Sequence, residues 1–179
     1  MQRYFIHSKQ IINQDIIITN SDVHHLKNVM RMKIGDNVFV CDDEENTYLS
    51  KISEIKKDEI ILKIIEKINV NNELKIDITI AHGLVRREKT EEVIRRIAEL
   101  GCYEYQPVLM KRSIVKVNQD RMERHNKIIK EACEQSQRNR LMILHHPISL
   151  DELIKRKSEF DLCLYADFNE NVVSVKTAL

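Results

Sequence analysis

Basic side chains gather at three places where the pattern predicts the end of a strand or the edge of a helix. They are Lys27, Arg31 and Lys33; Arg86-Arg87-Glu88-Lys89; and Lys111-Arg112-Ser113 with Lys116. Ligands of α/β sheets bind beyond the carboxyl ends of the strands, and Lys and Arg side chains there bind phosphate groups. The clusters therefore predict a phosphate-bearing ligand such as nucleic acid.

Each cluster also has a plainer interpretation. A solvated helix explains Lys27, Arg31 and Lys33 equally well, and basic residues at a helix start oppose the helix dipole. A fourth cluster, Glu131 to Arg138, contains Glu131, Glu134 and Arg138 at spacings of three and four, which is typical of surface ion pairs. Taken together, the clusters after Gly83 and Leu109 and at the end of the predicted helix suggest one shared rim.

The charge distribution supports the same interpretation. The whole chain has a net charge of +1, which alone indicates nothing about nucleic acid. Between Leu84 and Arg140, however, 14 Lys and Arg stand against 9 Asp and Glu. A locally basic segment in a neutral chain favours a partner that carries phosphate.

Other kinds of site are disfavoured. His24 and His25 are adjacent and diverge on a helix, and the four cysteines form no short-spaced pair, so we predict no metal site. The three glycines are isolated, so no glycine-rich phosphate loop can form. We expect reduced, mostly buried thiols in a cytoplasmic protein. The apolar runs are too short for a membrane span, and the N-terminus does not resemble a signal peptide.

The first 70 residues are predicted to be mainly β. Short strands joined by polar turns are expected at residues 3–6, 15–19, 37–41, 47–52 and 59–68. Ser21 is expected to cap a short helix. Many short strands of this kind predict a small closed or nearly closed β-barrel.

A polar stretch at residues 69–73 predicts a domain boundary, after which β and α patterns alternate. Strands are expected at residues 74–81 (buried on both faces), 105–109, 141–144 and 160–165, and helices after Thr90, over 120–138 and after Ser149. The first helix should bury Val93, Ile94, Ile97 and Leu100 and end at Gly101, whereas Ser149 and Glu152 should form a capping box. This alternation predicts a mainly parallel sheet covered by helices.

Four stretches of the chain resemble the RsmE group of ribosomal RNA methyltransferases. They are Arg3-Tyr4-Phe5; His25 through Asp36; Ala98-Glu99-Leu100-Gly101 through Pro107 to Arg112-Ser113; and Glu131-Ala132-Cys133-Glu134-Gln135-Ser136 with Arg138, followed by Pro147 to Leu150. The resemblance runs over nearly the whole chain. It implies a PUA-like RNA-binding β-barrel over residues 1–70. Over residues 74–179 it implies a SPOUT-type α/β methyltransferase domain that is incomplete at its C-terminus, with the region of the family's trefoil knot missing.

The resemblance further implies a homodimer that uses S-adenosylmethionine to methylate N3 of a uridine in 16S ribosomal RNA. It implies the small ribosomal subunit or its RNA as partner, with no membrane and no metal. In this chain Arg86-Arg87-Glu88-Lys89 replaces the family's Lys-Gly-Asp-Lys turn. The glycine-rich loop and closing helix that form the knot and cofactor pocket are expected beyond Leu179. We therefore expect the 179-residue chain to be inactive alone; the alternative is a non-catalytic RNA-binding or dimerisation fragment.

Site residues follow from the clusters and the resemblance together. Arg112 and Arg138 are expected to stabilise the negative charge that develops on the uracil oxygens. Phosphate contacts are expected from six further residues: Arg3, Arg31, Lys33, Arg86, Arg87 and Lys89.

Overall fold

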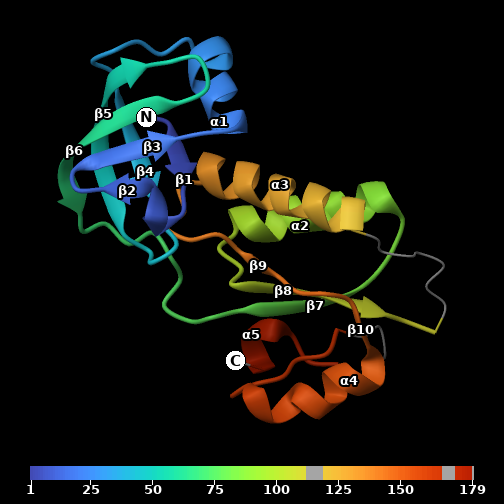
Figure 1. Cartoon of the computed structure of the whole chain (residues 1–179). Helices are drawn as coiled ribbons and strands as arrows, with labels where there is room; N and C mark the ends of the chain where they lie inside the picture. Colours follow the sequence, from blue (N-terminus) through green and yellow to red (C-terminus); the bar gives the residue numbers. More distant parts are fainter. Residues whose placement is uncertain (112–118, 167–171, 179) are drawn as a thin grey trace.

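The computed structural model describes residues 1–111, 119–166 and 172–178, which form a curled β-sheet domain joined to an α/β domain (Figure 1). The first domain contains six strands: β1 (Arg3–Phe5), β2 (Ile11–Ile12), β3 (Asp15–Ile18), β4 (Asn37–Cys41), β5 (Thr47–Ile55) and β6 (Ile60–Ile68). Their order is β1-β4-β5-β6-β3-β2, with β1 parallel to β4 and the other pairs antiparallel. The predicted strands of this domain are confirmed.

The sheet curls around a single apolar core. The β5–β6 pair has two register shifts, after Leu49 and after Ile52, and irregularities of this kind increase the bend and twist of a strand. Alternate residues point inward, as the pleat requires, so that β3 buries Ile16 and Ile18 and β4 buries Val38 and Val40. The result is the nearly closed barrel that the sequence predicts.

A short helical segment covers one end of the barrel. It comprises α1 (Ser21–His24) and the π-helical turn η2 (His25–Val29), while the 3-10 turn η1 (Ser8–Gln10) lies between β1 and β2. The expectation that Ser21 caps this helix is wrong. Asn20 occupies the cap position, with φ +59°, and its side chain makes no capping hydrogen bond, so Ser21 is already helical.

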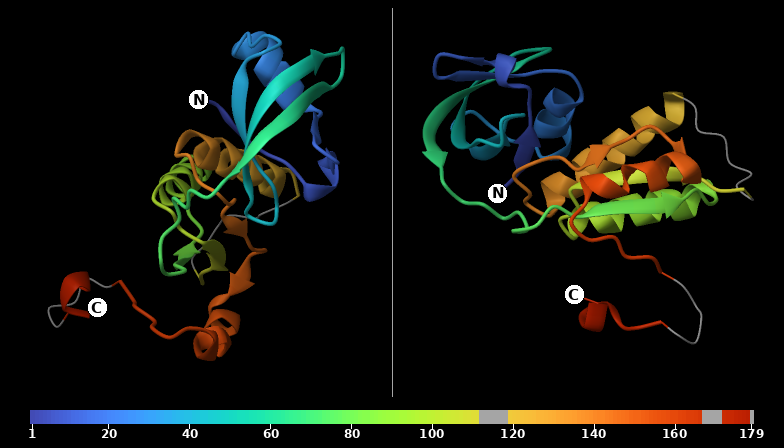
Figure 2. Two further views of the ribbon diagram at one scale, coloured as in Figure 1. Left: turned by 90° about the vertical axis from the view of Figure 1, so that its left-hand side faces the viewer. Right: turned by 90° about the horizontal axis from the view of Figure 1, so that it is seen from below.

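The second domain is a parallel sheet with helices on both sides. Strands β7 (Thr79–Gly83), β8 (Glu104–Leu109) and β10 (Ile148–Ser149) lie in the order β10-β8-β7, and β9 (Ile143–Leu144) also pairs with β8. Helices α2 (Arg87–Glu99) and α3 (Gln119–Gln135) cover one face (Figure 1). On the other side lie α4 (Leu150–Lys155) and the 3-10 turn η3 (Arg156–Glu159) (Figure 1). The short α5 (Val175–Ala178) lies away from the sheet (Figure 2).

The helix-covered face of the sheet forms the second core. Ile94 and Ala98 of α2 pack with Ile129 of α3 and Tyr105 of β8, all buried. Phe5 and Cys41 of the barrel belong to this same cluster. The two domains therefore share apolar contacts, and α3 contacts both the sheet of the second domain and β1 of the barrel.

Two local expectations for the second domain are confirmed. Gly101 has φ +93°, the left-handed conformation that favours glycine directly after a helix. Ser149 and Glu152 form both halves of a capping box at the start of α4. The described residues include no helix with the length and apolarity that a membrane span needs.

Several expectations for this domain are wrong. The strand predicted at residues 74–81 begins at Thr79 and is only half buried, because α4 packs mainly on β8 and β10 rather than on β7. Helix α2 begins at Arg87, so Thr90 is internal, where its hydroxyl donates to the carbonyl of Val85. Leu100 is 76% exposed because it lies past the last helical turn.

The segment predicted as a last strand, residues 160–165, forms none. It finds no partner strand among the described residues, and a strand needs its backbone groups paired. Leu162, Leu164 and Tyr165 are exposed, and Figure 2 shows this segment running away from the sheet. Three cysteines are buried as predicted, and Cys163 of this segment is exposed.

Candidate functional site

A buried ion pair lies at the junction of the two domains. Arg138, just after α3, donates from Nη2 to Oε2 of Glu73 at 2.7 Å, and each side chain is only 3% exposed. Its Nη1 donates to the carbonyl of Cys102 at 2.8 Å. Burial alone would raise the pKa of Glu73, but hydrogen bonds from Arg138 and from the amide of Asn139 lower it below its usual value. The pair is therefore charged and fully hydrogen-bonded.

The expectation that Arg138 contacts uracil stays a prediction; the contacts that Arg138 makes in this structure are all within the protein. Its guanidinium is enclosed and already pairs with a carboxylate and with backbone carbonyls at the C-terminal end of α2. Arg86 and Arg87 lie at the other end of this 13-residue helix, which at about 1.5 Å per residue is roughly 20 Å long. The cluster that ends α3 and the cluster that begins α2 therefore do not form one rim.

Arg3 is also a structural residue. It is 5% exposed, its Nη1 donates to the carbonyl of Arg138 at 2.6 Å and to Sγ of Cys41 at 3.4 Å, and its guanidinium lies 5.6 Å from the centre of the Phe39 ring. These contacts fasten β1 to the end of α3 and bury the guanidinium. The RNA contact of Arg3 stays a prediction.

Asn139 completes the junction. Its Nδ2 donates to Oγ1 of Thr47 in the barrel and to the carbonyl of Val70 in the linker, at 2.8 and 2.7 Å. Its Oδ1 accepts from the amide of Asn72. Next to it, Arg140 contacts the carboxylates of Glu45 and Asp77. Barrel, linker and α/β domain are thus connected by hydrogen bonds that fix their relative orientation.

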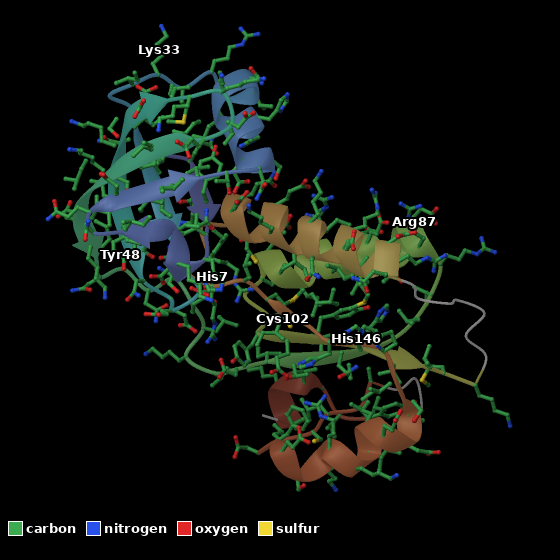
Figure 3. The ribbon with its side chains drawn as sticks, in the orientation of Figure 1. His7, Lys33, Tyr48, Arg87, Cys102 and His146 are labelled. Carbon is green, nitrogen blue, oxygen red and sulfur yellow. The ribbon has the colours of Figure 1, made fainter. Side chains whose placement is uncertain are left out.

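Two of the predicted phosphate contacts, Arg31 and Lys33, lie exposed on the barrel. Arg31 has φ +52° and follows η2, and the amide of Lys33 donates to Asp36, which closes the turn into β4. Figure 3 shows Lys33 at the end of the barrel remote from the sheet of the second domain. Both side chains are accessible to a ligand.

The cluster at the start of α2 is exposed but partly paired. Arg87 contacts Oε1 of Glu91 at 2.8 Å, and Lys89 contacts Glu92 at 3.1 Å. No hydrogen bond or ion pair of the Arg86 guanidinium occurs among the described residues, so its charge faces solvent. Of this cluster, Arg86 has the charge most available to phosphate.

Glu91 is the hub of this end of the domain. Arg124 of α3 donates to both of its carboxylate oxygens, at 2.6 and 2.7 Å, in addition to the contact from Arg87. The hydrogen bonds from Arg124 are the main reason that the pKa of Glu91 falls to about 2. Basic residues at the start of α2 oppose the helix dipole, and the negative charge of Glu91 offsets this unfavourable placement. The sequence indicates that some group must do so but does not identify Glu91.

Arg112, the other predicted uracil contact, lies outside the described residues, as do Ser113 and Lys116. Lys111, which directly precedes them, is exposed after the end of β8. The role of Arg112 therefore stays a prediction.

The sequence pattern groups Glu134 with surface ion pairs, but the structure places it at the junction of the two domains. Glu134 of α3 is largely buried against β1, and burial raises its pKa to about 7. Lys130 lies 3.8 Å from Glu134 and forms a 2.6 Å ion pair with Asp22 of α1. The spacing of Lys130 and Glu134 suggests an ordinary ion pair on a helix surface. The barrel covers this pair only in the folded protein.

Two of the hollows on the described surface are formed wholly or mainly by the barrel domain. One of about 240 Å³ lies between the barrel and Lys130 of α3. The other, of about 420 Å³, lies on the barrel between α1 and the β5–β6 turn. No glycine lines either of them. Neither hollow therefore contains the glycine-rich loop that the resemblance leads us to expect around S-adenosylmethionine.

Comparison with known families assigns both domains. Residues 18–65 match the RNA methyltransferase PUA domain, and residues 72–178 match the RNA methyltransferase domain. The chain is 39% identical over 176 residues to ribosomal RNA small subunit methyltransferase E of Bacillus subtilis, covering 93% of this chain and 68% of the relative. It is 29% identical to the protein of the same name from Synechocystis, covering 86% of this chain and 50% of the relative.

A solved structure gives the same assignment. The ribosomal RNA small subunit methyltransferase E of Neisseria gonorrhoeae, a structure bound to S-adenosylmethionine, superposes with a TM-score of 0.80 at 25% identity. The match covers 86% of this chain and 64% of that one. The chain thus spans between half and about two thirds of these relatives. With its PUA barrel and SPOUT-type α/β domain, it belongs to the family of ribosomal RNA small subunit methyltransferase E.

Proposed function

We propose that this chain provides the RNA-binding domain and the first part of the catalytic domain of an enzyme that methylates N3 of a uridine in 16S ribosomal RNA. S-adenosylmethionine would supply the methyl group, since the related structure from Neisseria gonorrhoeae binds it. The substrate class follows from the relatives, whose names specify the small-subunit RNA. The choice of N3 rests on the family resemblance.

The observation that carries this proposal is the fixed junction between the domains. Arg3, Asn139 and the Glu73–Arg138 pair hold the barrel in one orientation on the α/β domain. RNA bound by the barrel would therefore reach the catalytic domain at a defined position. Binding contacts far from the reacting atoms can position a substrate in this way. Arg31, Lys33 and Arg86, with Arg87 and Lys89, are the proposed phosphate contacts, and Arg112 is the proposed uracil contact.

The reaction itself can be tested with small ribosomal subunits from a strain that lacks this modification. A protein that contains this chain and the remainder of a full-length family member should transfer one labelled methyl group per subunit, and digestion should identify 3-methyluridine. If the label is found on a uridine methylated at another atom, the N3 assignment is rejected but the methyltransferase activity is retained. An unlabelled RNA would reject both.

We further propose that the 179-residue polypeptide does not methylate by itself. Leu162, Leu164 and Tyr165 are exposed, and no glycine-rich loop lines either of the two hollows. Titration of S-adenosylmethionine into the purified polypeptide, followed by calorimetry, should give no binding heat. Stoichiometric binding would contradict this proposal, because a cofactor pocket would then exist within these residues.

The exposed segment also favours the second candidate, a non-catalytic RNA-binding or dimerisation fragment. An apolar segment such as residues 162–165 would be covered in a homodimer, which we propose for the family member as a whole. Sedimentation velocity over a range of concentrations tests this, since a monomer at every concentration rejects dimerisation. We place the protein in the cytoplasm, where its proposed RNA substrate is made.

A further inference from the structure

The barrel carries a hollow that the known domain assignments do not explain. It measures about 420 Å³, within the range of about 300–1,000 Å³ typical of small-ligand sites. One wall is the α1–η2 segment and the other is the turn between β5 and β6. Val23, which is buried, contributes an apolar surface, and His24, Lys27, Asn28, Lys57 and Asp58 surround it. The hollow therefore combines apolar contact with polar and cationic groups.

The polar groups around this hollow are available to a ligand. Among the residues that the structure describes, the side chains of His24, Asn28 and Lys57 take part in no hydrogen bond or ion pair. Lys27 donates only to the carbonyl of Lys56, at 3.3 Å, which brings its ammonium group next to the β5–β6 turn. The two lysines outweigh Asp58, so the hollow favours an anion.

The chain next to the hollow exposes an unusual mixture of side chains. Val29 is 57% exposed and Ile34 is 65% exposed, while Arg31 and Lys33 between them point their charges to solvent. The π-helical η2 and the positive φ of Arg31 shape this segment. Backbone forms of this kind are retained most often at functional sites.

This mixture distinguishes between kinds of RNA. Double-stranded RNA is contacted through phosphates and 2′-hydroxyls, for which cations and polar groups suffice. Unpaired nucleotides also present base faces, which bind aromatic and apolar side chains, and base edges, which bind amides. His24 offers a ring for stacking, Asn28 an amide for a base edge, and Val29 and Ile34 apolar surface.

We propose that this hollow binds one unpaired nucleotide of the RNA substrate, with Lys27 and Lys57 at its phosphates and His24 and Asn28 at its base. Arg31, Lys33, Val29 and Ile34 would hold the adjoining nucleotides. This inference rests on the proposed function, because it assumes that the chain binds RNA. It adds that the barrel reads a single-stranded segment.

The test uses the full 179-residue chain and fluorescence anisotropy with two labelled probes, a short single-stranded RNA and a blunt RNA duplex of equal length. Wild-type protein should bind the single strand more tightly. His24→Ala should weaken single-strand binding by roughly tenfold, as loss of one stacked base predicts, and should leave duplex binding unchanged. Lys57→Ala should lower the slope of log affinity against log salt by about 0.7.

Lys63→Ala is the matched control, since Lys63 is an exposed lysine on β6 that does not line the hollow. It should change the single-strand affinity much less than Lys57→Ala, and thermal unfolding should show that all three variants are folded. If the wild-type protein binds RNA but His24→Ala and Lys57→Ala behave like the control, the proposed nucleotide site in the hollow is rejected. The RNA-binding function is then retained. Tighter binding to the duplex would also reject the proposed nucleotide site. Absence of binding to either probe would reject the RNA-binding function together with this inference.

Discussion

Glu73 and Arg138, 65 positions apart in the sequence, meet in a 2.7 Å ion pair in which both side chains are only 3% exposed. Glu73 lies in the linker after the barrel, and Arg138 follows the last helix that packs on β1. Glu73 also accepts hydrogen bonds from the amides of Asn139 and Arg140. The pair therefore ties the linker to the α/β domain at the point where the barrel is attached.

Removing one partner of this pair should strongly destabilise the protein. Glu73→Ala leaves the Arg138 guanidinium buried without its carboxylate, which costs about 3–5 kcal/mol. Urea unfolding followed by circular dichroism should show a fall of this size in the free energy of unfolding. Glu92→Ala is the control, because Glu92 forms an exposed pair with Lys89 and should cost no more than about 0.5 kcal/mol. Equal effects of the two variants would contradict the structural role of the pair.

Glu134 predicts a dependence of stability on pH. Burial raises its pKa from 4.5 to about 7, so the folded protein binds this proton more tightly than the unfolded chain. The stabilisation is fully present below the unfolded pKa near 4.5 and is lost as pH rises through about 7. Glu134→Gln removes the buried charge. It should raise the free energy of unfolding at pH 8, by on the order of 1–3 kcal/mol, and have little effect at pH 5.

Thermal unfolding of both proteins across this pH range measures the difference directly. The matched control is Glu131→Gln, on the same helix but exposed to solvent, which should give the same small change at both pH values. A Glu134→Gln variant that is less stable than the parent at pH 8 would show that the carboxylate is stabilised by Lys130 rather than penalised by burial.

Local features of the fold were predictable from the sequence because they depend on neighbouring residues. The capping box of Ser149 and Glu152 and the left-handed Gly101 each need only a few adjacent positions. The alternation in β4 similarly specifies which side chains point inward. The prediction for β7 failed for the opposite reason, since burial of both faces depends on which helices cover the strand, and α4 packs mainly on β8 and β10.

The candidate site was less predictable, because a basic residue has the same sequence signature whether it is exposed or buried. The Arg3 guanidinium donates to the carbonyl of Arg138 only in the folded protein. No residue within ten positions of either arginine indicates this contact. Arg31, Lys33 and Arg86 have the expected exposure because the elements beside them end at the surface. The charge clusters in the sequence thus identify basic segments, but they do not distinguish residues that could bind RNA from residues with a structural role.

Arg86 should contribute to RNA binding through charge alone. Its guanidinium faces solvent at the start of α2, so Arg86→Ala should remove about one phosphate contact and lower the salt slope of binding by about 0.9 for a helical RNA. Arg96→Ala is the control, since Arg96 pairs with Glu99 in the last turn of the same helix. If both variants lower the slope equally, overall charge rather than a local contact determines affinity.

Arg3 and Arg31 should respond to substitution in opposite ways, although both lie on the barrel. Arg3→Ala removes the donor to the carbonyl of Arg138 and the packing against Phe39. It should lower the free energy of unfolding by about 1–3 kcal/mol and leave the salt slope of RNA binding unchanged, because its guanidinium is buried. Arg31→Ala should lower the slope by about 0.7–0.9 with little change in stability, because its side chain is exposed. Urea unfolding and anisotropy titrations on the same two preparations separate these outcomes. A lower slope for Arg3→Ala, in a variant that remains as stable as the parent, would mean that the junction opens to admit RNA.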